Sequence, residues 1–177
     1  MSRPRIIGGS AKGRELLTPT SGTRPSPARL REALFDILAF EPRGRFLDLF
    51  SGSGAIGLEA ASRGWSAVCV ELAAPASDVI RRNATALALD VEVVKGDAVH
   101  FASGHRGEFD VVFAAPPYPL DLEKLFEKVL TAGPAVPGGL YVLQHPSGFA
   151  VTVPGGVTAE EPRVKRYGSN SLTLVRA

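Results

Sequence analysis

Residues 46–57 read FLDLFSGSGAIG and give the strongest indication of the fold class. This stretch begins with a mostly apolar run of five residues, a pattern typical of a strand buried in a parallel sheet. Residues 52–54 then turn the chain, and a predicted helix over residues 55–63 ends at Gly64. A strand, a glycine-rich turn and a helix in this order predict an α/β fold. The turn is expected at the carboxyl end of its strand, where ligands bind in such folds.

The same alternation continues along the chain. Ser26 and Pro27 are expected to begin a helix whose apolar stripe runs from Leu30 to Leu38. Further helices are predicted over residues 74–87 and 122–130, and further strands over residues 67–70, 91–94, 109–114 and 139–143. Hairpins are predicted at both ends, over residues 5–17 and 163–175. We therefore expect a mainly parallel seven-stranded sheet with an antiparallel C-terminal hairpin.

Composition narrows the class of protein. The 177 residues are 45% apolar and 21% charged, which suits one packed domain. The single cysteine, Cys69, excludes a disulfide framework and a cysteine-cluster zinc site, and it is expected in the core. With no apolar run near 18 residues and no metal-ligand motif, we expect a cytoplasmic protein without membrane or metal. The sequence does not indicate the oligomeric state, and a monomer is the default expectation. The single domain would comprise an N-terminal hairpin and helix (residues 1–40) and a core (residues 41–177).

The charges are unevenly distributed. Residues 1–31 contain seven Arg or Lys against one acid, and residues 163–177 contain four and none, while the whole chain has a net charge of only +2. Two basic ends on an acidic body suggest a surface for a polyanion if they meet in space. A set of solvated arginines would show the same composition, so charge alone leaves both interpretations open.

Gly52, Gly54 and Gly57 form the pattern G-x-G-x-x-G between a predicted strand and helix, with Glu71 about 20 residues further on. Glycines let a ligand approach the backbone, and a helix N-terminus attracts an anion. That anion is a pyrophosphate in a dinucleotide and a carboxylate in S-adenosylmethionine, and Glu71 could bind ribose hydroxyls in both. A turn tightened only for packing remains the alternative.

Two aspartates refine this choice. Asp48 lies within the strand, where a dehydrogenase normally has an apolar residue, and its burial would need compensation. The ammonium group of a methionine-type ligand would supply it, although the loop's own amides are an alternative partner. Asp97 could accept a hydrogen bond from an adenine amino group, or it could be an ordinary turn or N-cap residue.

Pro116, Pro117 and Tyr118 follow a predicted apolar strand. The two prolines restrict the backbone, so the preceding carbonyls would project outward. The tyrosine ring offers a flat face on which a base can stack. The alternative is a rigid connector with Tyr118 packed on the core.

Together these motifs resemble the RsmD-type 16S rRNA guanine-N2 methyltransferases over nearly the whole length. The matching segments are residues 5–9, 12–14, 24–26, 29–35, 47–54, 57–60 and 165–168. The resemblance implies a class I methyltransferase fold of the Rossmann-like type. It also implies S-adenosylmethionine as cofactor, with S-adenosylhomocysteine as its product. The implied reaction is methylation of one guanine, on its exocyclic N2 amine, in 16S rRNA of the small subunit or its assembly intermediate.

Carried onto this sequence, the resemblance assigns three groups of residues. The cofactor would be held by Asp48, Ser51, Gly52, Gly54, Glu71, Leu72, Asp97 and Ala98. The target base, flipped out of its stack, would be held by the backbone carbonyl of Ala115 and by Pro116, Pro117 and Tyr118. The rRNA phosphates would be contacted by Arg5, Lys12, Arg14, Arg24, Arg29, Arg31, Lys165 and Arg166.

The chain departs from the family motif at Ala115, where Asp or Asn is usual, and at Gln144, where an acid is frequent. Losing the side-chain acceptor for the attacking amine would cost about 1.5–3 kcal/mol, or roughly ten- to hundredfold in rate. Three other functions stay open. Ala115 favours an rRNA-binding assembly factor of the same fold, the G-x-G-x-x-G pattern is shared with NAD-dependent oxidoreductases, and Pro-Pro-Tyr is shared with DNA adenine methyltransferases.

Overall fold

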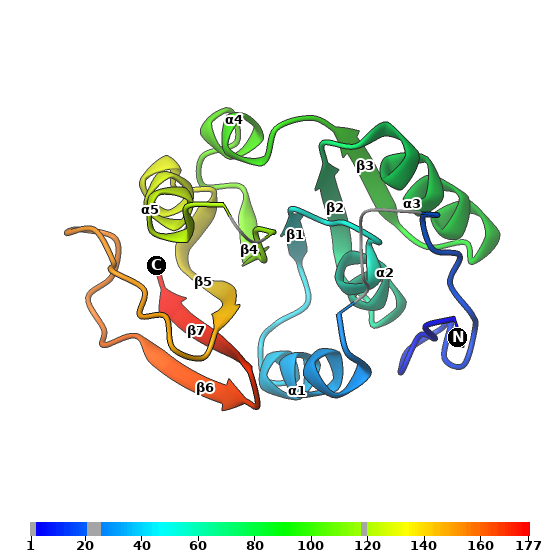
Figure 1. Ribbon diagram of the computed structural model, residues 1–177, viewed down its shortest axis with the longest axis horizontal. Coiled ribbons are helices and arrows are strands. Elements are labelled where there is room, and N and C mark those ends of the chain that lie inside the picture. Colours follow the sequence, from blue (N-terminus) through cyan, green and yellow to red (C-terminus); the bar gives the residue numbers. More distant parts are fainter. Residues whose placement is uncertain (1–2, 21–25, 118–119) are drawn as a thin grey trace. The chain divides into compact units, whose positions relative to one another are not determined.

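The computed structural model describes residues 3–20, 26–117 and 120–177 (Figure 1). By its internal contacts the chain divides into two units, residues 1–96 and residues 97–177. Each unit contains a part of the predicted sheet together with the helices that pack on it. The predicted functional residues are divided between the two units.

The first unit has three parallel strands, each following or preceding a helix. Its elements are α1 (Ala28–Leu38), β1 (Arg45–Leu49), α2 (Ala55–Ser62), β2 (Ser66–Glu71), α3 (Ala74–Ala86) and β3 (Val91–Lys95). β2 pairs with β1 on one side and with β3 on the other, and both pairs are parallel. This register brings the carboxyl ends of β1 and β2 to the same edge, because Leu49 lies opposite Val70.

Residues 5–14, here called the N-terminal loop, run beside α2 and α3 (Figure 1). Ile6, Ala11 and Leu16 are buried with Leu58 of α2 and Ile80 of α3. The predicted hairpin is smaller than expected, since Arg5 and Glu15 form an isolated antiparallel bridge rather than extended strands. Apolar burial against α2 and α3, more than strand pairing, therefore holds this segment.

Two features of α1 differ from prediction. Pro27, not Ser26, is the N-cap residue, and it makes no side-chain cap hydrogen bond. The buried face includes Arg31 and Phe35 as well as Leu30, Leu34 and Leu38. Phe35 stacks on Phe46 of β1 with ring centroids 6.1 Å apart, which explains why the packed face is wider than the leucine stripe.

The second unit combines a parallel strand pair with antiparallel C-terminal strands. Its elements are α4 (Ala98–Ser103), β4 (Phe109–Ala114), α5 (Leu122–Ala132), β5 (Ala135–Pro146), β6 (Arg163–Tyr167) and β7 (Asn170–Arg176). β4 and β5 are parallel, whereas β7 pairs antiparallel with both β5 and β6. The predicted C-terminal hairpin is therefore present.

The strand order is β3-β2-β1 within the first unit and β4-β5-β7-β6 within the second. This order, with its parallel strands and antiparallel C-terminal pair, confirms the predicted Rossmann-like α/β fold class. The short helix α4 was not predicted, and β5 begins earlier and ends later than the predicted strand. The expected division into residues 1–40 and 41–177 stays a prediction. Within the described residues, no helix combines the length and apolar character needed to span a membrane.

Candidate functional site

The glycine loop after β1 has a backbone that few side chains tolerate. Phe50, Gly52 and Gly54 all have positive φ, at 58°, 58° and 78°. A Cβ at Gly54 would lie 2.7 Å from Ile80 of α3, so glycine is required there for space as well as conformation. The loop is held by hydrogen bonds from the Ser51 N–H to the Val70 carbonyl (3.0 Å) and from the Gly54 N–H to the Ser51 carbonyl (2.8 Å). The result is a fixed turn leading into the N-terminus of α2.

Asp48 is buried in β1 beneath this loop, with 1% of its surface exposed. The Gly57 N–H donates to its Oδ2 over 3.0 Å, and the Cys69 Sγ lies 3.9 Å from the same atom. Burial raises the pKa of the Asp48 carboxyl to about 7, against the hydrogen bond from Gly57, which lowers it. An amide partner is thus present, as the alternative interpretation expected, but it does not offset the desolvation of the charge. A cation beside Asp48 would offset this desolvation.

Gly57 is needed because Asp48 and Cys69 approach its backbone. A Cβ at Gly57 would overlap the Cys69 Sγ and would lie 3.2 Å from Asp48 Oδ2. Cys69 is fully buried, as predicted for a core residue, and burial raises the pKa of its thiol. The third glycine of the motif therefore serves close packing of α2 on β1 and β2, and that packing brings its N–H to Asp48.

Glu71, at the end of β2, faces the same loop. Its Oε1 accepts from the Gly52 N–H (2.7 Å) and its Oε2 accepts from the Ala73 N–H (2.8 Å). Each oxygen retains a further lone pair, so hydroxyl donors can be added without breaking these bonds. The neighbouring Leu72 is 68% exposed and presents an apolar surface next to the carboxylate. The first unit thus brings five predicted cofactor residues together: Asp48, Ser51, Gly52, Gly54 and Glu71.

In the second unit, Asp97 is the N-cap of α4. Its Oδ2 accepts from the His100 N–H over 2.8 Å, which matches the alternative interpretation of this residue. The following residue, Ala98, is buried. The Asp97 carboxylate retains lone pairs for an adenine amino group, but nothing in the structure tests that contact, so the proposed role of this pair stays a prediction.

The segment after β4 is described as far as Pro117. Ala115 is half-buried, Pro116 is buried and Pro117 is exposed. The Pro117 carbonyl accepts from the Leu120 N–H over 3.3 Å. Tyr118 lies outside the described residues, so its predicted stacking role stays a prediction.

The basic residues differ in how far they can reach a polyanion. Arg5, Lys12, Arg14, Arg29, Lys165 and Arg166 are exposed. Arg5 is already bound to Glu15 (2.7 Å), and Arg24 lies outside the described residues. Arg31 is the exception, because only 2% of it is exposed. Its guanidinium donates to the Ser26 and Arg5 carbonyls, both at 2.8 Å, so the expected phosphate contact by Arg31 is corrected to a structural role.

Sequence reasoning missed the importance of Glu59 and Ser62 on α2. Both are buried and both bind the N-terminal loop. A signal for Glu59 was available, because it is the single charged residue in the otherwise small and apolar segment AIGLEAAS. A buried helix tolerates such a residue only where partners compensate its charge.

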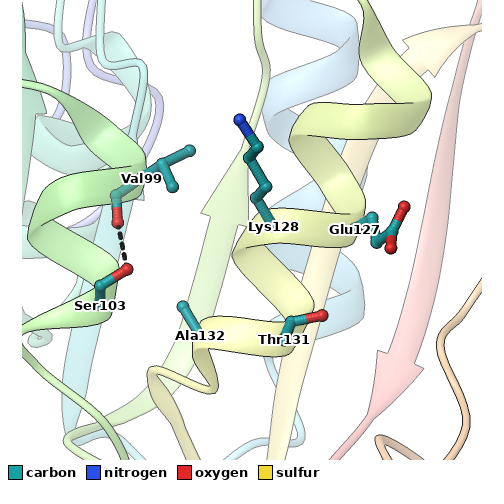
Figure 2. A pocket seen from close by; sticks show the side chains of 6 residues that line it. All are labelled: Val99, Ser103, Glu127, Lys128, Thr131 and Ala132. Atoms are coloured by element: carbon teal, nitrogen blue, oxygen red, sulfur yellow. Dashed lines mark hydrogen bonds between the residues drawn. The ribbon is translucent and has the colours of Figure 1, made fainter.

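A shallow groove of about 300 Å³ lies between α4 and α5 in the second unit (Figure 2). Its lining residues are Val99, Ser103, Glu127, Lys128, Thr131 and Ala132. The Ser103 hydroxyl is bound to the Val99 carbonyl (2.9 Å) within α4. None of these six is a predicted site residue, and the site is better defined by the glycine loop than by this groove.

Known proteins are similar to this chain in sequence and in fold. The chain is 41% identical over 118 residues to Ribosomal RNA small subunit methyltransferase D of Escherichia coli, a match of 64% of this chain and 60% of that protein. It is 32% identical over 126 residues to the Haemophilus influenzae protein of the same name, covering 67% and 65%. The matched part thus spans about three fifths to two thirds of these relatives. A hypothetical protein of Thermus thermophilus has a solved structure that aligns with a TM-score of 0.86 and 44% identity, covering 98% and 99% of the two chains.

The family comparison covers almost the whole sequence. The model of the family described as Conserved hypothetical protein 95 matches residues 4–176. This match includes the N-terminal loop, the glycine loop and the C-terminal hairpin, which are the segments on which the resemblance rested. The chain therefore belongs to the Conserved hypothetical protein 95 family, the family of RsmD-like rRNA methyltransferases.

Proposed function

We propose that this protein transfers a methyl group from S-adenosylmethionine to the exocyclic N2 amine of a guanine in 16S rRNA. The observation that carries the proposal is the buried Asp48 carboxyl beneath the glycine loop, which forms no salt bridge with the part of the chain that the structure describes. A nicotinamide dinucleotide would bring a pyrophosphate toward this carboxylate, which is unfavourable. A methionine-type ligand would bring an ammonium group, which is favourable.

The other residues of the first unit suit the same ligand. The loop glycines leave the backbone open to a carboxylate at the N-terminus of α2. Glu71 is fixed by the Gly52 and Ala73 amides, and it would accept from ribose hydroxyls. Leu72 would cover one face of the adenine, and Asp97 and Ala98 would contact its edge. When bound, S-adenosylmethionine supplies an electrophilic methyl group on its sulfonium.

The residues after β4 would receive the target base. Pro116 and Pro117 would hold the guanine edge, and Tyr118 would stack on its face. The Ala115 carbonyl would accept a hydrogen bond from the N2 amine and so orient it toward the methyl group. Because the carbonyl is uncharged, this orientation is weaker than the one an Asp would provide, and positioning of the amine would supply most of the acceleration.

The exposed basic residues would bind phosphates. Such contacts position the RNA without reading its sequence. The names of the relatives indicate a small-subunit rRNA, so the substrate would be the small subunit or its assembly intermediate.

Labelled S-adenosylmethionine and small subunits lacking the modification test the proposal. We expect one methyl group per subunit, recovered as N2-methylguanine after digestion, and little transfer to duplex DNA. Transfer to adenine in DNA would support a DNA methyltransferase instead. Calorimetry that finds NAD binding and no S-adenosylmethionine binding would refute the proposal.

A second function is favoured by Ala115 alone. With the usual acidic or amide acceptor absent, the protein could bind immature small subunits as an assembly factor without methylating them. Tight binding of subunits with no methyl incorporation would establish this function.

A further inference from the structure

The buried carboxylate of Glu59 binds the N-terminal loop to α2. Its Oε1 accepts from the Ile7 N–H and its Oε2 from the Gly8 N–H, both at 2.9 Å. Two arginines compensate its charge: the Nε of Arg63 lies 2.8 Å from Oε2 and the Nε of Arg31 lies 3.8 Å from Oε1. No part of Glu59 is exposed. One side chain therefore joins the loop, α1 and α2.

Ser62, one helical turn further along α2, adds three directional contacts. Its hydroxyl accepts from the Ala11 N–H (2.9 Å) and donates to the Gly8 carbonyl (2.6 Å), and its carbonyl accepts from the Ser10 N–H (2.8 Å). Gly9 has a φ of 82°, and a Cβ there would overlap the Ser62 carbonyl. The loop can take this close position on α2 only with glycine at residue 9.

These contacts exceed what attachment of the segment requires. Ile6, Ala11 and Leu16 already bury apolar surface against α2 and α3. A buried ion pair rarely stabilises a fold more than well-packed apolar residues would. Hydrogen bonds to Ile7, Gly8, Ser10 and Ala11 instead fix the orientation of the loop, which presents the exposed Lys12 and Arg14.

The same helix begins at the cofactor loop. Gly54 is its N-cap, and Glu59 follows five residues later, about 7.5 Å along the axis at 1.5 Å per residue. We propose that Glu59 and Ser62 are positioning residues, which hold the basic N-terminal loop at a fixed distance from the cofactor loop. An rRNA phosphate bound by Lys12 or Arg14 would then place the target guanine relative to the methyl donor. This inference rests on the proposed function.

Ser62→Ala is the decisive variant, because it removes contacts with the loop and leaves every charge in place. Ser77→Ala is its matched control, since that fully buried hydroxyl donates to the Ala74 carbonyl inside α3. We expect Ser62→Ala to speed amide exchange at Ala11. It should raise KM for small subunits about three- to tenfold, the effect of one hydrogen bond, while kcat and the Kd for S-adenosylmethionine change less than twofold. Ser77→Ala should lose about as much thermal stability as Ser62→Ala but should leave KM unchanged.

Glu59→Gln extends the test where it folds. The NH2 group of the glutamine would point at a backbone N–H, so two hydrogen-bond donors would face each other. The two arginines would also lose their carboxylate partner. We therefore expect a larger rise in KM than for Ser62→Ala. Two results for Ser62→Ala would overturn the inference. One is faster amide exchange in the N-terminal loop with an unchanged KM for small subunits. The other is no change in either the amide exchange or KM. A wild-type chain that transfers no methyl group would instead refute the proposed function, and the exchange data would show whether the loop contacts nevertheless exist.

Discussion

Asp48 and Glu59 are two buried carboxylates of the first unit with opposite surroundings. Glu59 meets two arginines and two backbone amides, so the fold itself compensates its charge. Asp48 has uncharged hydrogen-bond partners, namely the Gly57 amide, the Ser51 hydroxyl and the Cys69 thiol, and burial raises its pKa to about 7. A folded chain that leaves one carboxylate poorly compensated retains electrostatic free energy that a cationic ligand can recover. We infer that Glu59 acts through the fold, by holding the N-terminal loop in place, and that Asp48 binds a ligand directly.

The largest effect is expected for Glu59→Ala. Removing this carboxylate leaves Arg31 and Arg63 without their shared acidic partner, and we expect the free energy of unfolding to fall by about 3–5 kcal/mol. Urea denaturation would measure the loss. Glu92→Ala, at an exposed position of β3, is the control and should change stability by less than about 0.5 kcal/mol. A similar small loss for Glu59→Ala would remove the contrast with Asp48.

Gly57→Ala tests the packing that brings an amide to Asp48. The added Cβ would overlap the Cys69 Sγ, so we expect a loss of about 1–3 kcal/mol. Cys69→Ala in the same chain should restore part of it, because the obstructing sulfur is then absent. Losses that simply add in the double variant would show that the two residues do not meet.

Asp48→Asn should stabilise the ligand-free protein at pH 8 by about 1–3 kcal/mol, since it removes a buried charge and retains an acceptor for the Gly57 N–H. The pKa of Asp48 is about 7 in the folded state and has its ordinary value of 3.8 in the unfolded state. Between pH 3.8 and pH 7 the folded state therefore binds more protons than the unfolded state. The stability that protonated Asp48 contributes is therefore complete below about pH 4 and is lost as pH rises through 7. Denaturation at pH 4.5, 6 and 8 should show a widening gap between variant and wild type. Asp78→Asn, at an exposed position, should show no such gap.

Ala115→Asp has the smallest expected effect. A charge-assisted acceptor for the attacking amine should raise the rate of methyl transfer about tenfold at most, or leave it unchanged. Single-turnover transfer to small subunits would measure it, with the Kd for S-adenosylmethionine as control. A large fall in rate would mean that the site orients the amine in a different way.

The fold was predictable because its signals are local. Alternating apolar runs and glycine stops located β1, α2, β2 and α3 within a few residues. The helix α4 escaped because six residues are too few for a helical periodicity to show. The N-terminal hairpin was predicted as larger than it is, because contacts with distant α2 replace strand pairing there.

The site was predictable where residues are close in sequence. The glycine loop, Asp48 and Glu71 meet as expected, because the ends of adjacent parallel strands share an edge. Arg31 was assigned wrongly, since an arginine beside an apolar stripe looks the same whether its head points to solvent or, as here, into a cluster with Glu59. Such a pairing across 28 residues is a property of the tertiary structure, which no local pattern encodes.

Asp48 is the proposed partner of the cationic amino group of the cofactor. The direct test is calorimetry at pH 8 on wild type and Asp48→Asn, each with S-adenosylmethionine and with methylthioadenosine, which lacks the amino acid part. We predict that Asp48→Asn weakens S-adenosylmethionine binding at least tenfold and leaves methylthioadenosine binding within twofold. An equal loss for both ligands, or no loss for either, would contradict the claim.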